Sequence, residues 1–281
     1  MRATAFLISI VFLALGNIPA HSQENATLQK VQALNWKDTA TPGNIAGKAT
    51  FKLDNGLRLL DAPNTSEFLT LLGNLSQANS YTVAKRNLEW FSVFSFAPEG
   101  YVVDDEKIDA DALLKALKES NAQSESERKS KGLPSLFLEG WFIPPRYDEI
   151  TKRIEWATLL RSDGGEKSVN FSTKILGRSG HMSVILVSDP ERLNTDIKEF
   201  KSALNGFEFV QGERYAEWKQ GDKVAAYGLG ALVLGGAAAV ATKKGLWAVL
   251  GGLLAGGWKI LLGLAVAAIA GLGSFFKKKT P

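Results

Sequence analysis

Apolar and polar residues alternate at the period of a β-strand in the middle of the chain. The segment 153–159 alternates, turn residues follow at 163–165, and the segment 169–176 alternates again. A turn at 177–180 and an apolar run over 182–187 complete the pattern. It predicts a three-stranded antiparallel meander.

Further strands are expected on both sides of this meander. The sequence Asp54-Asn55-Gly56 is typical of a hairpin turn, so the segments 50–53 and 57–60 are expected to pair with each other. Strand-forming residues bounded by turn residues indicate additional strands at 81–83, 90–96, 136–143 and 207–210.

Three helices are expected between the strands. One is capped by Asn64 or Thr65 and runs to Leu72, with Gly73 at the C′ position, and a second starts at Asp189-Pro190 and runs to about Leu204. Asp109 is expected to cap the third, over 110–119. Grouped strands with a few helices between them predict an α+β fold with an antiparallel sheet.

The segment 104–109 (DDEKID) is the densest acidic cluster. Counted from Asp104, the sixth position of a calcium-binding loop would be Asp109 where glycine is needed, and the twelfth would be Lys115 where glutamate is needed. We therefore interpret Asp109 as a helix cap, with Asp111 complementing the helix dipole.

The C-terminal part of the chain is strongly apolar. Residues 224–242 carry no charge, and residues 245–276 are interrupted only by Lys259. Nineteen helical residues extend roughly 28 Å, close to the hydrocarbon thickness of about 30 Å in a bilayer. We expect a Gly-rich transmembrane helical anchor over 223–281, with spans at about 224–242 and 260–276.

Lysines flank these predicted spans at 243–244 and 277–279. With an exported domain, two spans would leave the terminal lysines outside, against the positive-inside rule. A single span followed by a re-entrant or surface-lying segment satisfies that rule, so both arrangements stay open. Small residues at four-residue spacing would allow close helix packing, within a hairpin or between copies. The glycines concerned are Gly235, Gly252, Gly256, Gly263 and Gly271.

Residues 1–22 have the features of a secretory signal peptide. Arg2 precedes the apolar run 3–15, and the small residues Ala20 and Ser22 follow on either side of His21. Cleavage is expected after Ser22 or after Ala20, and an uncleaved anchor is the alternative. A polar tether over 23–46 and an exported α+β domain over 47–222 would follow, on the periplasmic side of a bacterial inner membrane.

Charge separates this domain from the anchor. The whole chain has a formal net charge of +4, but residues 24–222 hold 25 basic and all 29 acidic residues, a net charge of −4. This balance argues against a nucleic acid partner, which needs clustered basic residues on a folded face. The basic surplus lies at the membrane boundary, where lysines meet lipid headgroups.

Motifs for chemistry are scarce. The chain has no cysteine, and His181 is the single histidine after the signal peptide, which removes disulfides, thiolate chemistry and a His-rich metal site. The sequence Gly177-Arg178-Ser179-Gly180 lacks the spacing of a nucleophile elbow, so His181 is interpreted as a turn or surface residue. No phosphate-binding loop occurs. We therefore expect neither cofactor nor metal, and no enzymatic activity.

Glutamate lies beside tryptophan or one residue from it at four places, including Glu139 with Trp141 and Glu155 with Trp156. Such pairs suit a glycan site, but strand neighbours face opposite sides, which favours a core tryptophan and a solvated glutamate. A carboxylate-dependent hydrolase or glycan binder is thus the alternative function. It would require Glu139 or Glu155 to share a cleft with Asp104 or Asp105, at separations of about 5 to 10 Å.

Four separated blocks resemble one protein family. They are 90–106 (WFSVFSFAPEGYVVDDE), 140–157 (GWFIPPRYDEITKRIEWA), 169–180 (VNFSTKILGRSG) and 212–230 (GERYAEWKQGDKVAAYGLG). These blocks are similar to the bacterial family of predicted membrane-anchored proteins catalogued as domain of unknown function 2167. The resemblance implies an exported α+β domain and a Gly-rich membrane segment, with no activity to transfer.

The resemblance also marks polar positions that become the candidate functional surface, although each also fits ordinary turn chemistry. They are Asp104, Asp105, Tyr147, Asp148, Arg178, Asp222 and Lys223. The expected function is a non-enzymatic sensor, scaffold or adaptor of the cell envelope that presents its domain to a membrane or periplasmic protein partner. Self-association is a further expectation. A small-solute or ion transporter fits poorly, because the predicted spans carry no acid or arginine.

Overall fold

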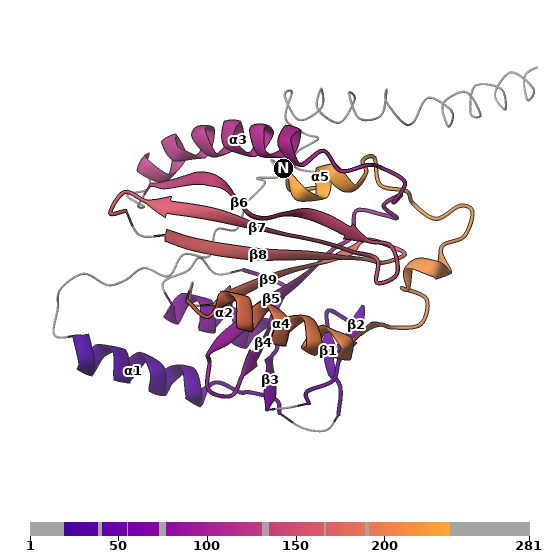
Figure 1. Cartoon of the computed structure of the whole chain (residues 1–281). Helices are drawn as coiled ribbons and strands as arrows, with labels where there is room; N and C mark the ends of the chain where they lie inside the picture. Colours follow the sequence, from indigo (N-terminus) through magenta and orange to yellow (C-terminus); the bar gives the residue numbers. More distant parts are fainter. Residues whose placement is uncertain are drawn as a thin grey trace, which may run out of the picture.

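The computed structural model of the chain describes residues 20–38, 41–54, 56–72, 77–130, 135–165, 167–188 and 191–236. Within these residues the chain forms a seven-stranded and a three-stranded antiparallel sheet with helices packed around them (Figure 1). The predicted α+β class is therefore confirmed.

The large sheet has the strand order β3-β4-β5-β9-β8-β7-β6. Its strands are β3 (Leu57–Leu60), β4 (Ser80–Lys85), β5 (Trp90–Ala97), β6 (Leu136–Asp148), β7 (Arg153–Ser162), β8 (Lys167–Leu176) and β9 (His181–Ser188). Strands β7, β8 and β9 pair in sequence order, which confirms the predicted meander. Strand β5 joins β9, so the N-terminal strands extend the same sheet.

The small sheet contains β1 (Gly43–Ile45), β2 (Ala49–Phe51) and β10 (Phe207–Phe209), with β2 in the centre. The predicted hairpin between 50–53 and 57–60 is therefore wrong, since β2 pairs with β1 and β10 while β3 pairs with β4. The turn itself forms, with the Leu57 N–H donating to the Asp54 carbonyl at 3.2 Å. It connects two sheets because buried Ala49 and Phe51 hold β2 in the core.

The helices are α1 (Ala20–Ala33), α2 (Ala62–Leu71), α3 (Ala110–Ser130), α4 (Leu193–Ala203) and α5 (Leu229–Val233), with short 3₁₀ turns η1 (Leu204–Gly206) and η2 (Tyr215–Glu217). Asp61, rather than Asn64 or Thr65, caps α2 by accepting the Asn64 N–H. Asp109 caps α3 as expected, accepting the Ala112 N–H at 3.0 Å.

Two predicted helix boundaries differ from the structure. The third predicted helix was expected to end at residue 119, but α3 continues to Ser130, because polar side chains in its second half bond to β6. The helix expected from 189–190 begins at Leu193, and residues 189–190 lie outside the described part of the chain.

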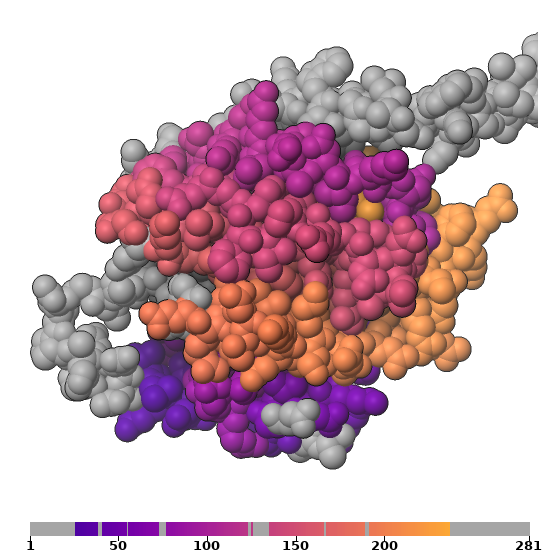
Figure 2. Space-filling view, in the orientation of Figure 1, coloured from indigo at the N-terminus to yellow at the C-terminus, as the bar shows by residue number. Residues whose placement is uncertain are grey.

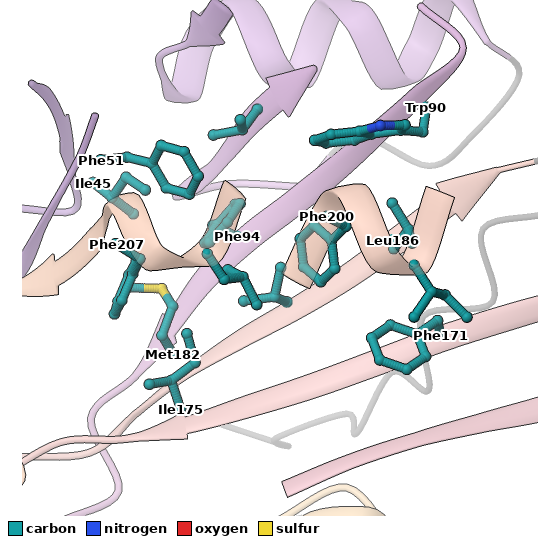
Figure 3. Packing of buried hydrophobic residues seen from close by; sticks show 14 of the residues in the cluster. Ile45, Phe51, Trp90, Phe94, Phe171, Ile175, Met182, Leu186, Phe200 and Phe207 are labelled. Atoms are coloured by element: carbon teal, nitrogen blue, oxygen red, sulfur yellow. The ribbon is translucent and has the colours of Figure 1, made fainter. Parts of the chain in front are cut away.

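One face of the large sheet is covered by α4 and the small sheet. Aromatic side chains fill this interface, with Phe200 of α4 packing edge-to-face on Trp90 and Phe171, and Phe51 on Phe94 (Figure 3). Burial of this many large apolar side chains gives the domain an ordinary hydrophobic core without disulfides.

The opposite face is covered in two parts. Helices α1 and α2 pack over β3, β4 and β5 through residues such as Phe68 and Phe91. Helix α3, α5 and η2 pack over the other end of the sheet, around Trp156. Alternate residues of each strand thus enter opposite cores, as the pleat of a sheet requires.

The C-terminal side of the domain reaches further than expected. Val224 is exposed and pairs with Tyr101 in a single bridge, and α5 is buried in the cluster around Trp156. The expected start of the first span at 224 therefore falls within the packed domain. Gly235, expected in a membrane helix, has a φ of +110° and lies in the turn after α5.

Within the described residues, none of the helices combines the length and apolar character needed to cross a bilayer. The rest of the expected span 224–242, the whole of 260–276, and Gly252, Gly256, Gly263 and Gly271 lie outside the described part of the chain.

The N-terminal side of the domain also begins earlier than expected. The predicted tether 23–46 contains most of α1 and all of β1, and both Val31 and Ile45 are buried. These apolar residues join two different core clusters, so the packed part starts before residue 47. Residues 1–19 lie outside the described part of the chain, and the expected cleavage positions fall in the first turn of α1.

Candidate functional site

Asp104 is the centre of a polar cluster at one end of the large sheet. Its Oδ2 atom accepts a hydrogen bond from the Tyr147 hydroxyl at 2.6 Å and one from the Lys152 ammonium at 2.7 Å. Tyr147 comes from the end of β6, and Lys152 from the turn between β6 and β7. Asp148 builds this turn by accepting the N–H groups of Ile150 and Thr151.

Aromatic rings extend this cluster to the surface. The Tyr101 ring stacks on Tyr215 with centroids 4.4 Å apart, and its centroid is 5.2 Å from that of Trp218. The Lys152 ammonium lies 5.0 Å from the Tyr215 ring, within cation–π range. Trp218 is 40% exposed, so the outer residue of this aromatic stack is partly accessible to solvent.

We call this set of residues the tyrosine surface: Tyr101, Asp104, Tyr147, Lys152, Tyr215 and Trp218. In Figure 2 the orange segment that follows α4 reaches the surface at one end of the molecule, beside the β6–β7 hairpin.

The protonation states of the tyrosine surface are fixed by its contacts. Burial, followed by the hydrogen bond to Asp104, raises the pKa of Tyr147 far above its usual value, and burial does the same to the pKa of Tyr215. Partial burial would raise the pKa of Asp104, but hydrogen bonds from Lys152 and Tyr147 outweigh it and lower that pKa. Near neutral pH the phenols of Tyr147 and Tyr215 therefore stay protonated, and Asp104 stays charged and paired with Lys152.

Besides the pair of Asp104 and Lys152, a second ion pair lies at the same end of the molecule. Arg178 holds Asp222 with two bonds, from Nε to Oδ2 at 2.6 Å and from Nη2 to Oδ1 at 2.8 Å. Asp222 also accepts the Lys219 N–H at 2.9 Å, which closes the loop after Trp218. The Arg178 contact, more than that backbone bond, lowers the pKa of Asp222 to about 2.

Backbone hydrogen bonds join the chain segments that carry the two ion pairs. The Tyr101 N–H donates to the Lys223 carbonyl, and the Ala225 N–H donates to the Tyr101 carbonyl, both at 2.8 Å. Gly100 permits this approach, because its φ is +103° and an added Cβ would lie 2.8 Å from the Lys223 oxygen. The segment that carries Asp222 is thus fastened directly to the aromatic stack.

The structure therefore brings together most of the residues expected from the sequence. Asp104 and Tyr147 touch, Arg178 and Asp222 touch, and Lys223 adjoins Tyr101. Asp105 is exposed beside Asp104, and Asp148 shapes the turn. Sequence reasoning missed Tyr101, Lys152, Tyr215 and Trp218. All except Lys152 are aromatic, and an aromatic residue in a sequence does not by itself distinguish the core from a binding surface, although all four lie within the blocks that carry the resemblance.

His181 is not a turn or surface residue as expected. It begins β9, is 3% exposed, and its Nδ1 atom has no hydrogen-bond partner. Burial, and then the charge of Lys174, lowers the pKa of His181 to about 3. The Lys174 ammonium donates to the Ser183 hydroxyl at 2.6 Å, and burial lowers the pKa of Lys174 to about 8.

The carboxylates required for the hydrolase alternative do not share a cleft. Glu155 pairs with Lys201 of α4, whereas its neighbour Trp156 packs on the opposite face with the cluster around Tyr215. Glu139 pairs with Arg161 at 2.9 Å. It lies near the start of β6, whereas Tyr147 lies near the end of that strand. Over the described residues, no group of three His, Cys, Asp or Glu side chains is placed to hold a metal ion.

These features define an α+β domain with a preformed aromatic and ion-paired surface at one end of its main sheet. Residues 38–270 match the model of the family described as "Protein of unknown function (DUF2167)", and the chain belongs to this family. The resemblance found in the sequence blocks is thereby confirmed.

Other comparisons add little. A search of curated proteins finds no match to the chain. Among solved structures, the solution structure of cyanobacterial PsbP (CyanoP) from Synechocystis sp. PCC 6803 is similar, with a TM-score of 0.35 and 11% sequence identity. The similarity covers 61% of this chain and 94% of that one.

Proposed function

We propose that this protein is a non-enzymatic adaptor of the bacterial cell envelope that binds a protein partner through the tyrosine surface. The apolar segment after the domain would hold it at the inner membrane, with the domain on the periplasmic side. The observation that carries this proposal is the exposed Trp218 ring on a stack of two tyrosines.

The chemistry of the tyrosine surface supports binding over catalysis. Its Asp104 carboxylate is paired with Lys152, and the raised pKa values of Tyr147 and Tyr215 keep these two phenols protonated, so none of the three is a free base or an activated nucleophile. Tryptophan, tyrosine and arginine are the residues that dominate binding energy at protein interfaces. Ion pairs on both sides hold the rings in place before a partner arrives, which reduces the entropy lost on binding.

The test is photo-crosslinking of the full chain in its native membranes. A photoreactive phenylalanine analogue at Trp218 should give a protein adduct of one defined mass, because this ring lies at the expected interface. The same analogue at Leu28 of α1, which is 44% exposed, is the matched control and should not give this adduct. Identical adduct patterns at both positions would refute the proposal.

A second variant separates binding from folding. Lys152→Met removes the charge that holds Asp104 while keeping the length of the side chain, so the tyrosine surface should lose its order. The defined adduct from position 218 should then weaken, whereas unfolding of the domain by urea should shift little, because Lys152 is partly exposed. An adduct of undiminished yield would count against the tyrosine surface as the binding site.

A further inference from the structure

Lys174 and Ser183 lie opposite each other in the large sheet. They are paired residues of the neighbouring antiparallel strands β8 and β9 (Figure 1), so their side chains leave the same face of the sheet. The Lys174 ammonium is 2.6 Å from the Ser183 hydroxyl. Both residues are half-buried, so the sheet holds the pair in place while solvent still reaches it.

The surroundings of Lys174 disfavour its charged form. Leu176 on the same face of β8, and its partner Ile154 on β7, are buried apolar residues. His181 lies on the same face of β9 as Ser183, is buried as well, and has no hydrogen-bond partner at Nδ1. Burial outweighs the charge of Glu99 and lowers the pKa of Lys174 to about 8.

This contact joins a nucleophile to a base. A serine hydroxyl is a weak nucleophile unless a neighbouring base accepts its proton, and a neutral lysine amine is such a base. With a pKa of about 8, Lys174 is neutral in about one-tenth of the molecules at pH 7, against fewer than about one in a thousand for an ordinary lysine. Serine–lysine pairs are a known variant of the serine–histidine arrangement in acyl transfer.

From this geometry we infer that Ser183 is a nucleophile that accepts an acyl group from an ester, with Lys174 as its general base. The Ser183 oxygen attacks the carbonyl carbon of the ester while its proton passes to the neutral amine of Lys174. The alcohol of the donor then leaves and takes this proton. The products are an acyl ester on Ser183, the free alcohol and the neutral amine, so the step needs no further reactant.

The residues on either side of Ser183 suit an ester with an apolar acyl group. Ile185 is the next residue on the same face of β9 and is half-buried, so it offers apolar surface beside the reacting oxygen. His181 lies on the other side, about 7 Å along the strand, and its unpartnered nitrogen gives that end a polar atom. A single transfer modifies the chain itself without turnover, so it adds to the proposed adaptor role and does not depend on the tyrosine surface.

The test labels the full chain in detergent micelles with a fluorescent alkyl fluorophosphonate, whose phosphorus takes the place of the acyl carbon. Attack by Ser183 releases fluoride and leaves a phosphonate ester, which peptide mass spectrometry locates. Ser183→Ala should not be labelled. Ser168→Ala removes another half-buried serine hydroxyl, on the same face of β8 as Lys174, and should leave the labelling rate of Ser183 unchanged.

Two variants of Lys174 separate a base from a structural contact. Arginine in Lys174→Arg keeps the charge and donates hydrogen bonds but stays protonated, so labelling of Ser183 should slow about a hundredfold. Lys174→Met fits the apolar surroundings, should be equally slow, and covers a disturbance of packing by arginine. In the wild type the labelling rate should rise with pH through a midpoint near 8, which both variants should lose. Protection of the Val184 amide from hydrogen exchange checks that each variant is folded.

Three results would overturn the inference. One is a wild-type chain that carries no label on Ser183. Another is labelling of Ser183 at equal rates in the wild type and in folded Lys174→Met, since Lys174 would then not act as the base. The third is a label on the Lys174 amine in place of the Ser183 oxygen, because the lysine would then be the nucleophile.

Discussion

Among single residues, His181 shows most directly how the fold sets a charge state. Its ring is buried at the head of β9, close enough to Lys174 to be influenced by that charge, and its Nδ1 atom has no partner. A protonated ring there would be a second positive charge near Lys174, in a position where burial already disfavours charge. The folded protein therefore keeps His181 neutral, with its pKa lowered to about 3.

This burial predicts a pH dependence of stability. Below pH 6.5 the unfolded chain takes up a proton at His181 while the folded chain does not, so the free energy of unfolding falls as the pH falls from 6.5 towards 3. Between pH 7 and pH 5 we expect a loss of about 2 kcal/mol from this residue. Urea unfolding of the wild type and His181→Gln should differ in pH dependence by this amount, and parallel profiles would contradict the expectation.

Asp222 gives a second prediction at this scale. The bidentate contact with Arg178 is the main reason that the pKa of Asp222 is about 2. In Arg178→Met this pKa should rise towards the ordinary value of 3.8. A ¹³C NMR titration of the side-chain carboxyl measures it, with Asp148 as the control, because its pKa is lowered mainly by the N–H group of its own turn and should not move.

At the level of helices and strands, local patterns predicted most elements but not all of their partners. The meander 153–187 was predictable because alternation and turn residues agree along the whole segment. The pairing of β2 was not, because its partner β10 lies about 150 residues further along the chain, and a nearby hairpin turn favoured the wrong neighbour. The end of α3 was missed because its polar second half bonds to a strand edge, a contact without apolar periodicity.

The candidate site was predictable to a similar degree. Three members of the two ion pairs, Asp104, Arg178 and Asp222, stood out as polar residues in turns, but Lys152 and the aromatic residues of the tyrosine surface did not. Lys152 contacts Asp104 across 48 positions of the chain, and Tyr215 reaches the Val102 carbonyl across 113. Such contacts depend on the tertiary fold, so no local pattern in the sequence indicates them.

Gly100 allows the segment after β5 to lie directly against the backbone of Lys223. Alanine there would have its Cβ 2.8 Å from the Lys223 carbonyl oxygen, at a φ of +103° that side chains rarely adopt. Gly100→Ala should therefore lower the free energy of unfolding by about 2 kcal/mol and weaken the bridge between Tyr101 and Val224. Gly164→Ala is the control, since its nearest atom is 3.7 Å away and it should change stability little. Equal effects in urea unfolding would contradict this argument.

At the scale of the whole molecule, the segment after the tyrosine surface decides where the folded domain ends. Residues 224–236 return along the sheet to place α5 among buried residues, and the Gly230 N–H donates to the Glu106 carboxylate at 3.0 Å. An apolar run is ambiguous between a lipid-facing helix and a core segment, and the five residues of α5 resolve it in favour of the core. In our proposal for the anchor, the membrane part therefore begins after residue 236.

Leu232 tests this boundary. Its side chain is 1% exposed in the cluster around Trp156, so Leu232→Ala should create a cavity and lower the free energy of unfolding by about 2 to 5 kcal/mol. If residues 224–242 were instead a lipid-embedded helix, the same change would leave unfolding of the domain unaffected. Leu28→Ala on α1 is the control, because that side chain is already 44% exposed and should cost little. Urea titration of the full chain in micelles, followed by tryptophan fluorescence, measures the unfolding midpoint of each variant. Equal midpoints for Leu232→Ala and Leu28→Ala would place α5 outside the core.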